Sequence, residues 1–139
     1  MADIRSVTEA FSVSPQLTSA DLPALAGRFR LVINNRPDGE ETGQPCGEEI
    51  EAAARAAGLD YRAIPISGPP GDAEVMAVRA ALEAADGPVL AYCRSGMRCI
   101  VAWSVAEAQA GRPIDEVRGL AAAAGYDVGG PLQALLSRS

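Results

Sequence analysis

The sequence predicts an α/β fold, a three-layer sandwich in which a mostly parallel sheet carries helices on both faces, within a single domain spanning residues 1–139. Two observations lead to this prediction. Short apolar segments alternate along the chain with longer segments whose apolar residues recur at helical spacing, and this alternation is typical of parallel sheets. The chain has 139 residues, a length that suits one domain with a substantial core.

The first half of the chain contains three predicted strands. Phe11–Ser14 alternates apolar and polar residues, as a half-exposed strand does. Leu31–Ile33 is rich in β-branched residues and is followed by a turn sequence at 34–39. In order, the patterns predict a strand at 11–14, a capped helix start at 18–21 that leads into a helix to about residue 26, a strand at 31–33, a helix at 48–57 stopped by Gly58, and a strand at 61–64.

The second half of the chain contains the most apolar strand. A loop of Gly and Pro residues at 67–71 precedes Asp72, which is placed to cap a helix that runs to about residue 85. Val89–Tyr92 is short and fully apolar, which is typical of a strand in the centre of a sheet. The remaining patterns predict helices at 98–110 and 113–124 and a short helix at 132–136.

The composition excludes several kinds of catalysis. The chain has no His and no Lys, so all 12 positive charges are Arg. Without His, the Ser-His-Asp and Cys-His mechanisms and the usual zinc hydrolases are excluded. Without Lys, Schiff-base chemistry and the phosphate-binding loop that ends in Gly-Lys-Ser/Thr are excluded. The remaining chemistry belongs to Cys, Asp, Glu, Ser, Tyr and Arg.

The net charge, the apolar runs and the cysteines predict where the protein is located and exclude two kinds of partner. A net charge of −6 argues against a general nucleic-acid binder. No apolar run approaches the ~20 residues of a membrane span, and the N-terminus lacks the pattern of a secretory signal. The three cysteines, Cys46, Cys93 and Cys99, fit neither a disulfide framework nor a zinc ribbon. We therefore expect a bacterial-type cytoplasmic protein with reduced thiols and no membrane or nucleic-acid partner.

The segment Val89–Arg98 carries the chemistry. Its buried strand ends at Cys93, a loop containing Gly96 follows, and a helix begins near Arg98. Ligands of open α/β sheets bind at the carboxyl ends of the strands. Loop N–H groups and a helix N-terminus there favour negative charge, so the Cys93 thiol is expected to ionise to a nucleophilic thiolate. The alternative is that Cys93 merely ends a core strand beside two surface arginines.

The other residues of this loop have expected roles. Arg98 is placed to hold an oxyanion with its guanidinium group. Gly96 permits the tight turn beneath the bound group. Ser95 is a candidate hydroxyl donor to the thiolate or to a leaving sulfur, and Met97 contributes an amide to the same loop. Arg94 either attracts an anionic substrate or pairs with the acidic surface.

Four further positions are candidates for the same rim. Arg36, which follows a predicted strand, is expected to add positive potential, and Asp38 to orient an arginine or act as an acid; the alternative is a polar turn. Cys99 is a candidate to resolve an oxidised or persulfidated Cys93 as a disulfide, or else packs under the sheet. Cys46, which follows Gly43–Pro45, is a further candidate to approach the rim.

Several segments, taken together, are similar to one bacterial family. They are Ser12–Gln16, Val32–Glu41, Gly43–Pro45, Ile64–Pro65 and Ala91–Arg98. In this order they resemble the phosphatase-like domain of the β-lactamase-hydrolase-like proteins, over nearly the whole chain. The resemblance implies a fold like that of the protein-tyrosine and dual-specificity phosphatases.

The resemblance also implies an activity. Cys93 would attack phosphorus in a phosphorylated small molecule or protein, while Arg98 and the loop amides hold the phosphoryl oxygens. The chain departs from the phosphatase pattern in three respects. Four residues instead of five separate Cys93 from Arg98, Tyr92 stands where His is usual, and no position clearly matches the acid. Asp72 is the best candidate for that acid, although capping the next helix is an alternative role.

The short loop is also similar to that of rhodanese-type sulfurtransferases. There the cysteine carries a persulfide, and a tighter loop suits one sulfur atom better than a tetrahedral phosphate. Under this alternative, Cys93 would accept sulfur from a sulfane-sulfur donor. Related domains occur fused to metallo-β-lactamase-like hydrolases, which makes such a hydrolase a candidate partner. Neither mechanism requires a metal or an organic cofactor.

Overall fold

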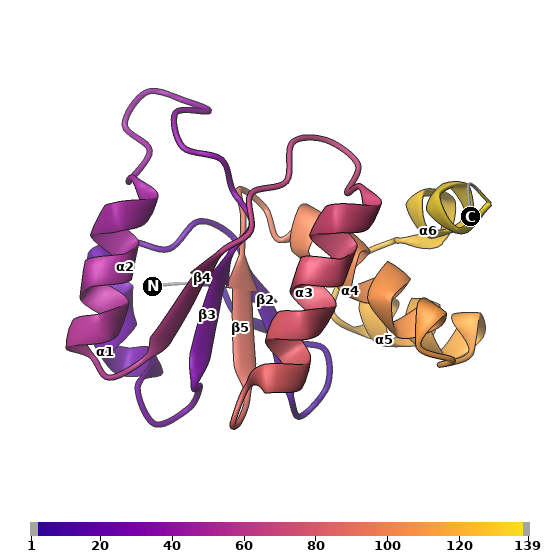
Figure 1. Cartoon of the computed structure of the whole chain (residues 1–139), viewed down its shortest axis with the longest axis horizontal. Coiled ribbons are helices and arrows are strands. Elements are labelled where there is room, and N and C mark those ends of the chain that lie inside the picture. Colours follow the sequence, from indigo (N-terminus) through magenta and orange to yellow (C-terminus); the bar gives the residue numbers. More distant parts are fainter. Residues whose placement is uncertain (1–2, 138–139) are drawn as a thin grey trace.

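A five-stranded sheet forms the centre of the molecule, whose computed structural model describes residues 3–137 (Figure 1). Its strands are β1 (Arg5–Ser6), β2 (Phe11–Ser14), β3 (Leu31–Asn34), β4 (Asp60–Ala63) and β5 (Val89–Tyr92). Their order across the sheet is β1-β2-β5-β3-β4. β2, β5, β3 and β4 run parallel, and β1 pairs antiparallel with β2. The mostly parallel α/β fold predicted from the sequence is therefore confirmed.

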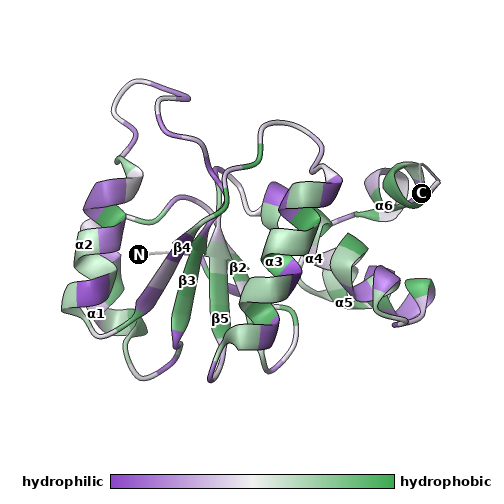
Figure 2. Cartoon of the chain, viewed as in Figure 1, coloured by the Kyte–Doolittle hydropathy of each residue, from purple (hydrophilic) through white to green (hydrophobic). Residues whose placement is uncertain are grey.

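Helices cover both faces of this sheet. They are η1 (Ser19–Asp21), α1 (Leu22–Leu25), α2 (Gly47–Ala56), α3 (Asp72–Ala84), α4 (Met97–Gln109), α5 (Ile114–Ala123) and α6 (Gly129–Leu136). In Figure 1, α1 and α2 lie on one side of the sheet and α3 and α4 on the other, with α5 and α6 farther out on the α4 side. Figure 2 shows that apolar residues concentrate on β3 and β5 and on the helix faces turned toward the sheet.

The alternation of side chains along β5 sends Cys93 to the α4 side of the sheet. Leu90 and Tyr92 belong to the core beneath α1 and α2. Val89, Ala91 and Cys93 belong to the larger core, which is shared with α3, α4, α5 and α6. Because successive strand residues point to opposite faces, the register of a fully buried strand fixes the direction of the sulfur.

The structure corrects four details of the sequence-based prediction. β2 is buried along its whole length, and Ser14 is accommodated because its hydroxyl donates to the carbonyl of Pro15 at 2.8 Å. The two-residue β1, too short to show a periodic pattern, was missed. α3 begins at Asp72 and is capped from Gly71, whose N–H donates to Glu74, so Asp72 is not the cap. α6 begins at Gly129, ahead of the predicted start at residue 132.

No helix among residues 3–137 combines the length and the apolar character needed to cross a membrane. Tyr61 and Trp103 are both buried. The Trp103 ring stacks on Phe11 with ring centroids 5.4 Å apart and planes 4° from parallel. This contact joins α4 to β2. It therefore holds the helix that comes after Cys93 in the chain against the sheet.

Replacing Trp103 with Ala tests the importance of this contact for stability. Loss of the buried indole leaves a cavity, and we expect the free energy of unfolding to fall by about 3–5 kcal/mol. Urea denaturation followed by far-ultraviolet circular dichroism measures the change. Met76→Ala is the control, because Met76 is 69% exposed and its loss should change stability by no more than about 0.5 kcal/mol. A similar loss in both variants would contradict the prediction.

Candidate active site

The candidate active site lies at the carboxyl edge of the sheet. Three connections meet at this edge: residues 93–96 between β5 and α4, residues 35–46 between β3 and α2, and residues 64–71 between β4 and α3 (Figure 1). The parallel strands bring these connections together although they are far apart in sequence. We use the name Cys93 loop for residues 93–98.

The sulfur of Cys93 lies inside the turn that starts α4. Cys93 is fully buried, and the N–H of Gly96 donates to its sulfur at 3.1 Å. Gly96 has a φ of 93°, in the left-handed region, and is the N-cap of α4. This backbone conformation favours glycine. The predicted arrangement of a strand, a Gly-containing loop and a helix N-terminus around the cysteine is therefore present.

The surroundings of Cys93 favour its thiolate. They lower the pKa of Cys93 to about 5, chiefly because the thiol of Cys99 donates a hydrogen bond to its sulfur. Burial opposes this effect, and the backbone N–H groups of Cys99, Gly96 and Ser95 reinforce it. Burial raises the pKa of Cys99 itself, so Cys99 remains a protonated donor. The thiolate form of Cys93 is the nucleophilic form of a cysteine.

Tyr126 holds the loop from the outside. Its hydroxyl donates to the carbonyl of Ser95 at 2.9 Å. A Cβ atom added to Gly96 would overlap this hydroxyl. Gly96 is thus required both by its positive φ and by the close approach of Tyr126, which comes from the connection between α5 and α6.

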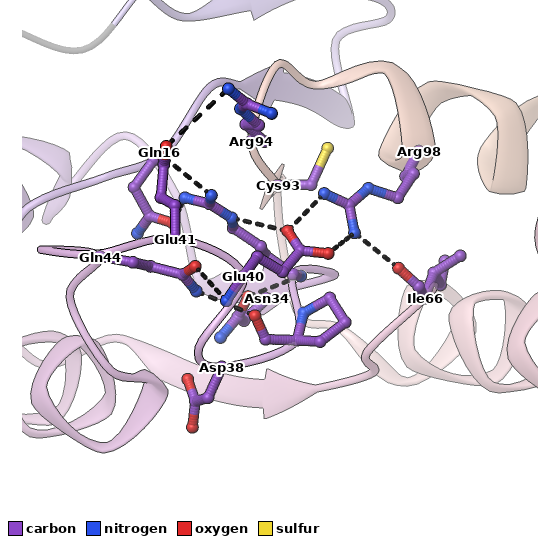
Figure 3. A network of polar contacts seen from close by, with 12 residues as sticks. Gln16, Asn34, Asp38, Glu40, Glu41, Gln44, Ile66, Cys93, Arg94 and Arg98 are labelled. Atoms are coloured by element: carbon purple, nitrogen blue, oxygen red, sulfur yellow. Dashed lines mark hydrogen bonds and ion pairs between the residues drawn. The ribbon is translucent and has the colours of Figure 1, made fainter. Parts of the chain in front are cut away.

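Arg98 is held by two acceptors that leave one of its edges open. Its Nη1 and Nη2 atoms each donate to a carboxylate oxygen of Glu40 at 2.8 Å, and Nη1 also donates to the carbonyl of Ile66 at 2.7 Å. None of these bonds uses the N–H of Nε or the second N–H of Nη2, which lies next to Nε. Figure 3 shows the Cys93 sulfur on the side of the guanidinium group that carries this open edge. The edge can accept an anion bidentately.

Glu40 is fixed by a second arginine. Arg36 is buried, and its Nε donates to Glu40 at 2.8 Å. Hydrogen bonds first from Arg98 and then from Arg36 lower the pKa of Glu40 to about 2. The carboxylate is therefore ionised at neutral pH and holds Arg98 in one orientation. An N–H of Arg36 and an N–H of Arg98, which come from different parts of the chain, thus donate to the same oxygen of Glu40, Oε1 (Figure 3).

Arg36 organises the 35–46 connection. Besides Glu40, it donates to Glu41 at 3.0 Å and to Gln16 at 3.0 Å. A buried arginine needs such partners because an unpaired buried charge is costly. The charge of Arg36 is thus matched by two carboxylates, and a contribution of Arg36 to substrate binding stays a prediction. Arg94 is exposed and lies 3.8 Å from Glu41, which corresponds to its predicted pairing with acidic residues.

Asp38 and Ser95 do not have their predicted contacts. The carboxylate of Asp38 accepts the N–H of Gly47 at 2.8 Å and thus caps α2, and Figure 3 shows it pointing away from Arg98. The Ser95 hydroxyl accepts the N–H of Met97 at 3.3 Å, while the backbone N–H of Ser95 acts on Cys93. Short polar side chains commonly bind nearby backbone groups, and both residues do so here.

Asp72 and Cys46 make no hydrogen bond or ion pair with the Cys93 loop in the part of the chain that the structure describes. Asp72 is the first residue of α3, and Cys46 is an exposed N-cap residue of α2. The acid role of Asp72 stays a prediction. All three cysteines are free thiols, and Cys99 is the one that lies against Cys93.

The family of the chain follows from its similarity to known proteins. A family model described as the phosphatase-like domain of the beta-lactamase hydrolase-like protein matches residues 3–110. The chain belongs to this family. It is 41% identical over 108 residues to a beta-lactamase hydrolase-like protein of Agrobacterium fabrum, covering 76% of the chain and 25% of that relative. A relative from Xylella fastidiosa is 37% identical over 129 residues, 91% of the chain and 30% of the relative.

Solved structures support the phosphatase-like fold of this family. The crystal structure of a "putative phosphatase" from Neisseria meningitidis has a TM-score of 0.86 and 34% identity, and the match covers 98% of both chains. More distant neighbours share the fold alone. They include TpbA of P. aeruginosa in complex with pTyr, with a TM-score of 0.58 and 20% identity, and PTPMT1 in complex with PI(5)P, with a TM-score of 0.71 and 13% identity.

Three contacts of this phosphatase-like domain were missed from the sequence. Glu40 carried a signal, since an acidic pair follows the turn after β3 at the same edge as Cys93. The Ile66 carbonyl and the Tyr126 hydroxyl carried none, because a backbone acceptor and a lone tyrosine have no pattern. Asn35 positions Ile66, because the carbonyl of Asn35 accepts the N–H of Ile66 at 3.0 Å.

The donor role of Cys99 can be tested by titration of Cys93. We expect Cys99→Ala to move the midpoint of thiolate formation upward from about 5, because the largest stabilising hydrogen bond is lost. Cys99→Ser keeps a donor and should remain close to the parent. The ultraviolet absorbance of the thiolate measures the midpoint, in a Cys46→Ser background and after subtraction of the Cys93→Ser variant. Equal midpoints in the Ala and Ser variants would show that the hydrogen bond is unimportant.

Proposed function

We propose that this domain is a cysteine-dependent hydrolase of phosphomonoesters, with Cys93 as its nucleophile and Arg98 as its oxyanion-binding residue. One observation carries the proposal: a thiol of lowered pKa and the open Nε–Nη2 edge of Arg98 face the same space. An anionic group bound there would meet the thiolate directly. The family and the phosphatase fold support the proposal, as do the phosphorylated ligands bound by TpbA and PTPMT1.

The proposed reaction has two steps. The Cys93 thiolate attacks phosphorus, so that an S–P bond forms while the P–O bond to the leaving group breaks and its electron pair goes to the leaving oxygen. Arg98 and the loop N–H groups stabilise the negative charge on the phosphoryl oxygens. Water then attacks phosphorus, the S–P bond breaks, and inorganic phosphate and the Cys93 thiolate are released.

The site favours leaving groups that depart without a proton. Glu40, which touches Arg98, has a pKa of about 2 and is ionised. No acidic side chain among residues 3–137 forms a hydrogen bond with Cys93. Asp72 remains the candidate acid on the strength of its position, at the end of the connection whose Ile66 carbonyl binds Arg98. An aryl oxide needs protonation less than an alkoxide does, so aryl phosphates are the better substrates.

An aryl phosphate assay tests the proposed function. We expect release of the phenol from an aryl phosphate, inhibition by vanadate, and loss of at least about a thousandfold in kcat/KM in Cys93→Ser, as when a nucleophile is removed. Cys46→Ser is the matched control, since Cys46 is an exposed cysteine outside the Cys93 loop. Activity that survives in Cys93→Ser would contradict the proposal.

The role of Glu40 as a positioning residue gives a separate prediction. Glu40→Gln replaces one of the two carboxylate oxygens that accept from Arg98 with an NH₂ group, which donates. Arg98 therefore loses its fixed orientation. We expect kcat for the aryl phosphate to fall by about 10- to 100-fold, with a smaller change in KM. Glu51→Gln is the control, because the ion pair that Glu51 forms among residues 3–137 is with exposed Arg55. An unchanged kcat would show that Glu40 does not position Arg98 for catalysis.

Sulfur transfer is the second candidate function, favoured by the four-residue interval between Cys93 and Arg98. With thiosulfate, the Cys93 thiolate would attack the outer sulfur, the S–S bond would break, and sulfite would leave with the electron pair. No proton is needed for this departure. The persulfide would then pass its outer sulfur to cyanide or a thiol.

Mass spectrometry separates this candidate from the first. If sulfur transfer is the function, thiosulfate adds the mass of one sulfur atom to Cys93, and thiocyanate forms once cyanide is added. The Cys93→Ser variant should show neither product. An unmodified Cys93 together with absent thiocyanate would eliminate sulfur transfer, whatever the result with phosphate esters.

A further inference from the structure

An apolar groove lies beside Arg98. It has a volume of about 500 Å³. Its walls come from the connection before α3, from the first turns of α4 and from α6. The lining residues are Gly68, Pro69, Pro70, Met97, Arg98, Val101, Pro131, Ala134 and Leu135. Arg98 is the sole charged residue among them, and the rest of the lining is apolar.

The groove is continuous with the proposed oxyanion site. Met97 and Arg98 belong both to the Cys93 loop and to the groove wall. The Arg98 side chain is 19% exposed, so part of it is accessible to a ligand. Its Nη1 atom is turned to the Ile66 carbonyl, at the start of the connection that forms the opposite wall. A molecule whose anionic group binds Arg98 can therefore continue into the groove without leaving the surface of the protein.

We propose that the groove binds an apolar substituent of the substrate that is larger than a single small ring, such as a fused aromatic system, while the anionic group lies at Arg98 and Cys93. This inference rests on the proposed function and narrows its substrate class. The volume exceeds what a phenyl group fills, and an apolar lining with one charged residue at its end is typical of sites for ligands with a polar head and an apolar body. A hydrophilic substituent would bury its polar groups there without partners.

Binding of two phosphonates tests the proposal without requiring hydrolysis. The probes are 2-naphthylmethylphosphonate and methylphosphonate, which share the anionic group and differ in the apolar substituent. Isothermal titration calorimetry with the full chain should show that the naphthyl compound binds at least about tenfold more tightly. Ala134→Trp places an indole in the groove and should remove this difference.

A neighbouring substitution is the control. Gln133→Trp adds the same bulk to α6, at an exposed position outside the groove lining, and should keep the preference for the naphthyl compound. Equal binding of the two phosphonates to the parent protein would overturn the proposal. Absence of binding by both, or a preference that survives in Ala134→Trp, would also overturn it.

The remaining outcomes separate the groove from the proposed function. If the preference is present and depends on Ala134 but no aryl phosphate is hydrolysed, the phosphatase proposal fails and the groove assignment stands. If aryl phosphates are hydrolysed at rates independent of Ala134→Trp and the phosphonates bind alike, the groove assignment fails alone. Association of two copies through the groove would appear in sedimentation as a dimer lost in Ala134→Trp, and would likewise overturn the proposal.

Discussion

The carboxylate of Glu40, shared between Arg36 and Arg98, is the interaction on which the rest of the site depends. Arg36 is buried after β3 and Arg98 lies in the first turn of α4, so one carboxylate ties together two segments that are far apart in the sequence. The buried charge of Arg36 makes the pairing obligatory. Because Glu40 occupies the Nη1–Nη2 edge of Arg98, the Nε–Nη2 edge is left toward Cys93, and the orientation of the oxyanion site follows.

The absence of His and Lys explains how Cys93 is activated. The donors that lower its pKa to about 5 are the Cys99 thiol and backbone N–H groups. An acidic group whose pKa is lowered in the folded protein stabilises the fold at pH values above its unfolded pKa, and this contribution is lost as the pH falls through the folded value. The Cys93 thiolate therefore stabilises the native state at alkaline pH and ceases to do so near pH 5.

Local patterns were sufficient for the fold and for half of the site. The apolar run of β5 predicted a central strand, and the glycine after Cys93 predicted the turn, because both depend on neighbours in sequence. Glu40 and Tyr126 meet the loop only through the tertiary fold: Glu40 lies 58 residues from Arg98, and Tyr126 lies 31 residues from Ser95. Two roles were open for Asp38 because the same acidic residue after a turn can face the site or cap a helix, and only the position of α2 decides between them.

The site supplies charge more readily than protons, and this constrains what it can transform. Its fixed groups are an arginine edge, backbone N–H groups and a buried thiol, while the carboxylate of Glu40, which binds Arg98, is ionised. A leaving group must then stabilise its own electron pair, as an aryl oxide or sulfite does. The ring of an aryl oxide is apolar, and the groove beside Arg98 has apolar walls. Under the proposed function, the electronic demand of the site and the shape of its surroundings would favour the same kind of substrate, an anionic ester with an extended aromatic group.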